Sequence, residues 1–221
     1  MINFINNLFK SKKETFKDKT NFKELASNKE IKDLFKLFNT YSDESELRFV
    51  GGCVRKLIND EIVDDIDLST NLKPENVIEI LKKNNINFYE TGIDHGTVTV
   101  VINKKSYEIT SLRKDIKTDG RHAQVEYTKN WLEDASRRDL TINAIYADIE
   151  GNLFDPFNGK KDLNDGLINF IGDPATRIKE DYLRILRYVR FFLGYSRNPH
   201  DKNNVKIIKQ NLSGLKQIST D

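Results

Sequence analysis

Apolar residues recur along this chain with helical spacing in some segments and strand spacing in others, and this predicts an order of elements. Residues 1–45 are rich in lysine and hold one clear helical pattern, formed by Ile31, Leu34, Phe35, Leu37 and Phe38. Residues 2–9 have a looser helical spacing followed by lysines, which suits a plain N-terminal extension better than a targeting signal.

The middle of the chain changes between the two spacings, which indicates a small mixed sheet with helices. Pro74 suits the first turn of a helix, so one helix is expected to begin there. A shorter helix is expected at residues 54–58. The expected strands cover residues 47–50, 66–69, 97–102 and 107–111.

A polar, charged stretch at residues 113–130 begins the second half of the chain, and its length suggests a functional loop. From Trp131 onward the pattern is mainly helical. A last helix is expected around residues 205–212. Before it, one strong helix is predicted by a single apolar face made of Leu183, Leu186, Val189 and Leu193.

Composition excludes several classes of protein. The 221 residues are 38% hydrophobic and 32% charged, and a net charge of +2 is too mild to indicate nucleic-acid binding by itself. No stretch approaches the roughly 20 apolar residues of a membrane span. Cys53 is the only cysteine, so we expect a core residue in a reducing, cytoplasmic compartment. The three histidines lack the spacing of zinc ligands.

Two short clusters suggest phosphate chemistry. Gly51 and Gly52 bring backbone N–H groups close to phosphate oxygens, because no Cβ stands in the way. Asp65 and Asp67 are expected on one face of a strand, since side chains alternate with period two. Carboxylate pairs of this kind hold Mg²⁺ against a nucleoside triphosphate. Together the clusters predict nucleotidyl transfer, although Asp-x-Asp alone also fits a glycosyltransferase or a solvated strand end.

Glu108 lies on an expected strand among β-branched and aromatic neighbours. Burying an unpaired carboxylate there would cost roughly several kcal/mol. Glu108 is therefore expected either at a sheet edge that faces water or beside a cation. A third carboxylate facing Mg²⁺ and a salt bridge to a lysine are about equally consistent with the sequence.

Arg137 and Arg138 form a pair that can grip phosphate oxygens in bidentate geometry. Asp139 follows directly and can orient one of the arginines. A capped helix with solvated arginines is the alternative interpretation of this segment.

A second group of charged residues falls on an expected helix, where residues three apart are neighbours. Asp181 and Arg184 are then side by side, with Arg187 and Arg190 further around the helix. An Asp–Arg pair can read the edge of cytosine or adenine without a template. The alternative is a surface salt bridge worth about 0.5 kcal/mol.

The order of these motifs resembles the class II tRNA nucleotidyltransferases, the CCA-adding enzymes, and their bacterial poly(A) polymerase relatives. The resemblance covers residues 48–219 and is specific, because many blocks occur in the right order. The matching segments are RFVGGCVR, DDIDLST, HGTVTV, YEITSLR, TDGRHAQVEYT, RRDLTINA, LFDPFNGKKDL and EDYLRILRYVRF.

The resemblance implies an α+β fold with a polymerase-β-like nucleotidyltransferase head, a small mixed sheet and a truncated α-helical neck. Residues 46–165 would form the head. Residues 166–221 would begin the neck, which recognises the base, and residues 1–45 would be an N-terminal extension with a helix.

Roles for single residues also follow from the resemblance. Asp65 and Asp67 would be the metal ligands of a two-metal Mg²⁺ site, with Glu108 as the third catalytic carboxylate. The residues that would bind the triphosphate are Gly51, Gly52, Arg55 and Arg138. The residues that would read the base of ATP or CTP, or line its pocket, are Asp181, Arg184, Arg187 and Arg190.

Residues 115–122 match the family's flexible loop, which is linked to the switch from C to A addition and argues against an enzyme that adds only CC. Two departures stand out. Lys56 occupies a position where the family usually has aspartate. The chain also stops at Asp221, where relatives continue into a body and tail that grip tRNA, so a split gene, a degraded gene product or a two-chain enzyme with a second polypeptide is expected.

The leading hypothesis is Mg²⁺-dependent addition of CMP and AMP to the 3′ end of tRNA, with ATP and CTP as substrates and no membrane partner. The second hypothesis is poly(A) addition to RNA 3′ ends, because the head motifs are shared. An inactive remnant, or a nucleotide-binding subunit of a split enzyme, is the third. A glycosyltransferase leaves RRDLTINA and EDYLRILR unexplained.

Overall fold

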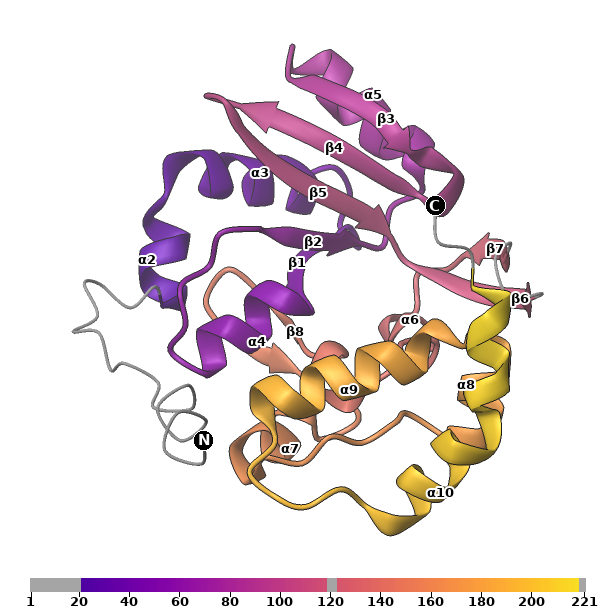
Figure 1. The fold of residues 1–221 in the computed structure, drawn as a ribbon. Coiled ribbons are helices and arrows are strands. Elements are labelled where there is room, and N and C mark those ends of the chain that lie inside the picture. Colours follow the sequence, from indigo (N-terminus) through magenta and orange to yellow (C-terminus); the bar gives the residue numbers. More distant parts are fainter. Residues whose placement is uncertain (1–20, 119–122, 219–221) are drawn as a thin grey trace.

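A seven-stranded mixed sheet organises the computed structural model, which describes residues 21–118 and 123–218 (Figure 1). The strand order is β3-β4-β5-β2-β1-β8-β9, with β2 and β5 parallel and the other neighbours antiparallel. This mixed sheet with helices confirms the predicted α+β class. The strands are β1 (Leu47–Val50), β2 (Asp67–Thr70), β3 (Asn87–Gly92), β4 (Thr97–Ile102), β5 (Lys105–Ser111), β8 (Tyr146–Ala147) and β9 (Leu153–Phe154).

The predicted strands agree with the structure in the middle of the sheet and disagree at its edges. Strands at residues 47–50 and 97–102 are confirmed, whereas β2 begins one residue later than predicted. The edge strand β3 and the short strands β8 and β9 were not predicted. In β3 most side chains are exposed, so no buried apolar face marks it in the sequence.

A separate hairpin of β6 (Arg113–Thr118) and β7 (Ala123–Tyr127) occupies most of the segment that was predicted to be a loop. That prediction was wrong because β6 reads RKDIKT, in which charges replace the usual apolar alternation. Figure 1 shows this hairpin beside the C-terminal helices. Residues 119–122 of the expected flexible loop lie outside the described residues.

One face of the sheet is covered by α3 (Lys29–Asn39) and α5 (Pro74–Lys83). The helical pattern predicted in the N-terminal segment corresponds to α3, which follows the short helix α2 (Phe22–Ser27). The buried side chains of α3 join the same core as Leu68 and Ile109 of the sheet. Residues 1–20 lie outside the described part of the chain. The domain bounds at residues 45 and 165 stay a prediction.

A second core is built from the C-terminal helices, coloured orange to yellow in Figure 1. Its central helix α9 (Leu183–Tyr195) buries Ile185, Tyr188 and Phe191. Helix α4 (Gly52–Ile58) lies between the sheet and this second core, because it contacts both β1 and α7 (Gly159–Asp165). The remaining helices are α6 (Trp131–Ser136), α8 (Pro174–Glu180) and α10 (Lys202–Asn211), with short turns η1 (Ile93–His95), η2 (Thr141–Asn143) and η3 (Leu212–Gln217).

Helix α9 was predicted correctly, but its buried face was not. The four residues of the predicted face are 40 to 80% exposed. Aromatic side chains on the neighbouring face fill the core instead, as shown by the stacked rings of Tyr188 and Phe170, whose centroids are 5.3 Å apart. The predicted last helix is confirmed as α10. Every helix within the described ranges is too short or too polar to cross a lipid bilayer.

Candidate active site

A cavity of about 610 Å³ lies between the sheet face that α3 and α5 leave open and the helix α9. It brings together ten of the eleven predicted site residues, although they come from distant parts of the sequence. The exception is Asp65, which is not among the lining residues. The ten are Gly51, Gly52, Arg55, Asp67, Glu108, Arg138, Asp181, Arg184, Arg187 and Arg190.

The glycine pair forms the turn from β1 into α4, between two charged side chains. Gly51 has a φ of 62°, in the left-handed region that side chains with a Cβ rarely adopt. A Cβ on Gly51 would stand 3.6 Å from an Nη of Arg138, and one on Gly52 would stand 3.6 Å from Oδ2 of Asp67. A side chain at either position would therefore touch the Arg138 guanidinium or the Asp67 carboxylate, and the glycines leave this part of the cavity open.

Asp67 and Glu108 face each other across the parallel strands β2 and β5, where they are register partners. Burial is the largest influence on Asp67 and raises its pKa, and the charges of Glu108 and Asp65 raise it further, against Arg138 and Arg55. Glu108 is exposed, and no ion pair to a lysine forms among the described residues. The site thus holds carboxylates that repel one another.

Asp65 was predicted to share a strand face with Asp67, and this is wrong. It lies in a bend just before β2, and its side chain is exposed. The strand begins only at Asp67, so the alternation of side chains does not extend to Asp65. Asp65 is nevertheless close enough for its charge to raise the pKa of Asp67.

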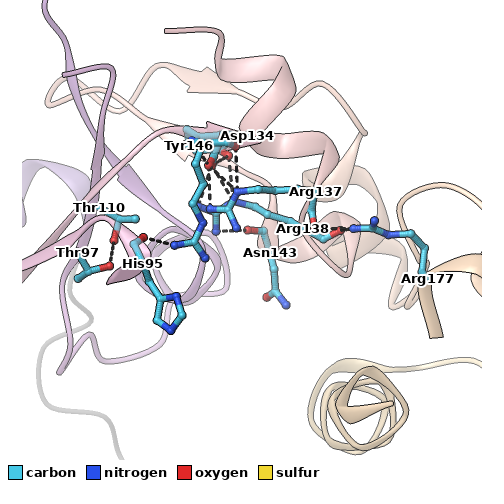
Figure 2. A network of polar contacts seen from close by, with 10 residues as sticks. His95, Thr97, Thr110, Asp134, Arg137, Arg138, Asn143, Tyr146 and Arg177 are labelled. Carbon is cyan, nitrogen blue, oxygen red and sulfur yellow. Dashed lines mark hydrogen bonds and ion pairs between the residues drawn. The ribbon is translucent and has the colours of Figure 1, made fainter. Parts of the chain in front are cut away.

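A cluster of buried polar groups fixes Arg137 and Arg138 beside the cavity (Figure 2). Its centre is Asp134 of α6, which is 1% exposed. Arg137 donates to Asp134 at 2.9 Å, the Tyr146 hydroxyl donates at 2.6 Å, and Arg138 donates at 3.2 Å. The backbone N–H of Arg113, at the base of the hairpin, also donates to it at 3.2 Å.

Asp134 is a stable anion in the fold. Burial alone would raise its pKa, but Arg138, Arg137 and the Tyr146 hydroxyl together lower it to about 2. Asp134 was not predicted as a site residue, because WLEDAS has the pattern of an ordinary short helix. Asp139 was expected to orient one of these two arginines, and this is wrong, because Asp134 accepts hydrogen bonds from both.

Asp139 instead connects the turn after α6 to helix α9. Its carboxylate accepts hydrogen bonds from Asn143 at 3.0 Å and from Arg187 at 3.4 Å. Burial would raise the pKa of Asp139, but these two partners lower it overall.

Arg55 lies at the junction between α4 and α9. It donates to the side-chain oxygen of Asn143, and its guanidinium carbon is 4.6 Å from the ring centroid of Phe191. Its Nε is buried and has no hydrogen-bond partner among the described residues. Lys56, the departure from the family pattern, forms an ion pair with Asp64 instead of lining the cavity.

The predicted pairing of Asp181 with Arg184 is wrong. Asp181 is extended, with φ −157° and ψ 107°, so the chain breaks between α8 and α9 instead of forming one helix. The carboxylate of Asp181 accepts the Leu183 N–H at 2.9 Å, whereas Arg184 donates to Glu180 at 2.7 Å. Both Asp181 and Arg184 still line the cavity.

Several lining residues were missed by the sequence analysis. The open sheet face adds three hydroxyl side chains, those of Ser69, Thr97 and Thr110. Ser69 and Thr110 stand two residues from Asp67 and Glu108, so the period of two in β2 and β5 could have revealed them. Thr97 is brought beside Thr110 by the pairing of β4 with β5. His95 and Arg113 also line the cavity, and the His95 carbonyl accepts from Arg113.

The residues suit a metal ion that is completed by a substrate. Within the described ranges, no group of three or more histidines, cysteines or carboxylates is arranged as a preformed metal site. Mg²⁺ is commonly bound by one or two carboxylates together with substrate phosphates and waters. Asp67 and Glu108 offer such oxygens, and a cation would relieve the repulsion that raises the pKa of Asp67.

Comparison with known proteins agrees with this geometry. Residues 47–169 match the family model described as the poly(A) polymerase head domain, and the chain belongs to this family. The predicted family resemblance is thereby confirmed.

The most informative relatives are CCA-adding enzymes. The chain is 43% identical over 192 residues to human mitochondrial CCA tRNA nucleotidyltransferase 1, an alignment that covers 86% of this chain and 44% of the relative. The fold matches the CCA-adding enzyme of Bacillus stearothermophilus in complex with CTP, with a TM-score of 0.73, 31% identity, and coverage of 87% of this chain and 46% of the other.

A third match is a tRNA nucleotidyltransferase complexed with a primer tRNA and an incoming ATP analogue, with a TM-score of 0.62 and 30% identity. It covers 79% of this chain and 49% of that protein. The chain therefore spans about half the length of the relatives it matches.

Proposed function

We propose that this chain transfers nucleotides from CTP and ATP to the 3′ end of tRNA, as a CCA-adding nucleotidyltransferase. The observation that carries the proposal is the Asp67–Glu108 pair, which faces an arginine-rich wall across one cavity. Carboxylates and cations that converge in this way suit a reaction on a metal-bound triphosphate. The names of the relatives supply the RNA substrate.

The proposed roles of the side chains follow from their positions. Arg138 and Arg55, together with the backbone of Gly51 and Gly52, bind the triphosphate. Arg138 is held in place by Asp134, so little side-chain freedom is lost when a phosphate binds. Asp181 and Arg184, at the start of α9, face the base.

Asp67 and Glu108, with Asp65 next to them, would hold Mg²⁺ in this proposal. The ion neutralises phosphate charge and lowers the pKa of the attacking hydroxyl when it is bound. The RNA 3′-hydroxyl loses its proton and forms a bond to the α-phosphorus, and the bond to pyrophosphate breaks on the opposite side. One phosphodiester and one pyrophosphate result for each nucleotide added. A two-metal site and a cytoplasmic location are further parts of this proposal.

The test is to incubate the purified chain with Mg²⁺, one labelled nucleoside triphosphate at a time and in mixture, and a tRNA transcript that lacks its CCA end. Incorporation that stops after C, C and A is expected. Asp67→Ala should abolish incorporation, and Thr40→Val, at the far end of α3, is the matched control. Normal incorporation by the Asp67 variant would contradict the proposed site.

A second candidate function is poly(A) addition, which the name of the matching family favours. ATP alone with a generic RNA separates the two functions: long A tails support poly(A) addition, and a stop after a few residues opposes it. If the chain binds CTP and ATP but extends no RNA, it is a nucleotide-binding fragment. Adding a second polypeptide with a helical, basic body would then test the split-enzyme hypothesis.

A further inference from the structure

The open face of the sheet carries a row of hydroxyl groups next to the carboxylate pair. Thr110 follows Glu108 by two positions on β5, so both side chains leave the same face. Thr110 is the register partner of Ser69 on β2 and of Thr97 on β4. The row Ser69–Thr110–Thr97 therefore runs across three strands beside the Asp67–Glu108 pair, and all five side chains line the cavity.

The strand order separates this row from the groups assigned to the triphosphate. β2 lies between β1 and β5, and the glycines and Arg55 follow β1 on one side of it. Thr110 and Thr97 lie on the other side, on β5 and β4. Phosphoryl transfer places the attacking and leaving oxygens roughly in line on opposite sides of phosphorus. If pyrophosphate leaves towards Arg138, the RNA end must approach over β5 and β4.

Thr97 and Thr110 meet as a pair on that side. Their hydroxyl oxygens are 2.9 Å apart, and both side chains are half-buried (Figure 2). Each hydroxyl has one hydrogen and two acceptor lone pairs, and their mutual bond uses only one of the two hydrogens. The pair can therefore donate one hydrogen bond and accept others at the same place.

We propose that the Thr97–Thr110 pair binds the ribose at the 3′ end of the RNA and recognises its 2′-hydroxyl. A 2′-hydroxyl is both a donor and an acceptor, which matches the capacity of the threonine pair, and it is the group that distinguishes RNA from DNA. His95 lines the same cavity. This inference rests on the proposed function, because it takes the RNA end as the second substrate.

The test combines two proteins with two RNAs. The proteins are the wild type and the double variant Thr97→Val/Thr110→Val, which keeps the β-branched shape and removes both hydroxyls. The RNAs are primers that end in a ribonucleotide or in its 2′-deoxy counterpart, each with its 3′-hydroxyl. For each combination, kcat and KM for the primer are measured, along with the Kd for labelled primer by fluorescence anisotropy with saturating CTP.

We expect the wild type to bind the 2′-deoxy primer roughly 3- to 10-fold more weakly than the ribose primer, the effect of one or two hydrogen bonds. The double variant should lose a similar factor on the ribose primer and lose nothing further on the 2′-deoxy primer. The change should appear in KM, with kcat and CTP affinity nearly unchanged. Thr97→Ser/Thr110→Ser should restore the discrimination, because serine keeps the hydroxyl.

Thr91→Val is the matched control, since Thr91 lies on the neighbouring strand β3 and does not line the cavity. Its discrimination between the primers should equal that of the wild type. If the valine double variant discriminates as well as the wild type, the proposal is wrong. If the wild type extends no RNA, the proposed function fails, and the anisotropy measurement alone then decides the ribose site: equal Kd values for both primers, or no binding, overturn it.

Discussion

Two aspartates beside the same cavity differ in almost every physical respect. Asp134 is fully buried, surrounded by donors, and has a pKa of about 2. Asp67 is partly buried, faces Glu108, and has a raised pKa. The protein itself supplies the cations and hydrogen-bond donors that stabilise the charge of Asp134. Asp67 instead lies near the repelling charges of Glu108 and Asp65. The difference separates a carboxylate that supports the site from one that is kept available for a ligand.

The largest effect should come from removing the charge of Asp67. Asp67→Asn should lower incorporation by at least about 1000-fold, roughly 4 kcal/mol in transition-state free energy, because the proposed metal ligand is lost. Steady-state incorporation of labelled CTP measures this loss. In the same variant CTP binding without metal should remain, since Arg138 and Arg55 are unchanged; loss of that binding would show that Asp67 is structural.

The same change should leave the fold slightly more stable. The pKa of Asp67 is raised in the fold, so folding disfavours its ionised form, and stability is lost as pH rises through the folded-state pKa. Asparagine carries no charge, so the melting temperature at pH 7.5 should rise by about 1 °C. A fall of several degrees would contradict the repulsion.

Removing Asp134 should destabilise the fold, which is the opposite of the effect expected for removing the charge of Asp67. Asp134→Ala leaves two arginines and the Tyr146 hydroxyl without their acceptor, and we expect the free energy of unfolding to fall by about 3 kcal/mol. Urea unfolding followed by circular dichroism measures it. Asp165→Ala is the control, because its ion pair with Lys161 is exposed and screened by solvent, so its loss should barely change stability. Equal losses in both variants would remove the distinction between the two aspartates.

The dependence of stability on acid pH should reveal the protonation of Asp134 in the wild-type protein. Its folded-state pKa of about 2 lies below the ordinary value of 3.8, so its stabilisation is complete above pH 4 and is lost as pH falls towards 2. The contribution is roughly 2 kcal/mol. Unfolding free energies of the wild type and Asp134→Asn, measured between pH 5 and pH 2, should converge; parallel curves would contradict the assignment.

A further variant tests how much the hydrogen bonds that Arg138 donates to Asp134 matter for nucleotide binding. Arg138→Lys keeps the charge but cannot keep the forked contacts to Asp134 and Tyr146, so the Kd for CTP should rise about tenfold. Arg187→Lys, on the exposed part of α9, should change it by less than about threefold. Isothermal titration gives both values, and a reversed order would place the main phosphate contact on α9.

The sequence predicted the part of the site that depends on local patterns. Gly51, Gly52 and Asp67 lie where short-range rules place them, because a glycine turn and a strand are defined by their immediate neighbours. Asp134 was missed because its role depends on Tyr146 and Arg113, which only the tertiary fold brings to it. The helix that was predicted to continue through Asp181 is also interrupted, because the backbone of Asp181 is extended.

The errors in the predicted fold have a similar cause. The hairpin of β6 and β7 lacks an apolar face, so its strands leave no alternation to recognise. On α9 the aliphatic residues form the more obvious stripe, yet the aromatic residues of the adjacent face fill the core. Hydrophobic spacing predicted that a helix exists and did not determine which way it faces.

The parallel pairing of β2 with β5 has a consequence for how the molecule acquires its activity. Asp67 and Glu108 are brought together by a ladder between strands that α5, β3 and β4 separate along the chain. Contacts between distant segments form late, because the entropy of closing a long loop must be overcome first. We therefore expect the carboxylate pair to assemble after the local contacts of each strand, and a nascent or partly unfolded chain lacks the paired carboxylates.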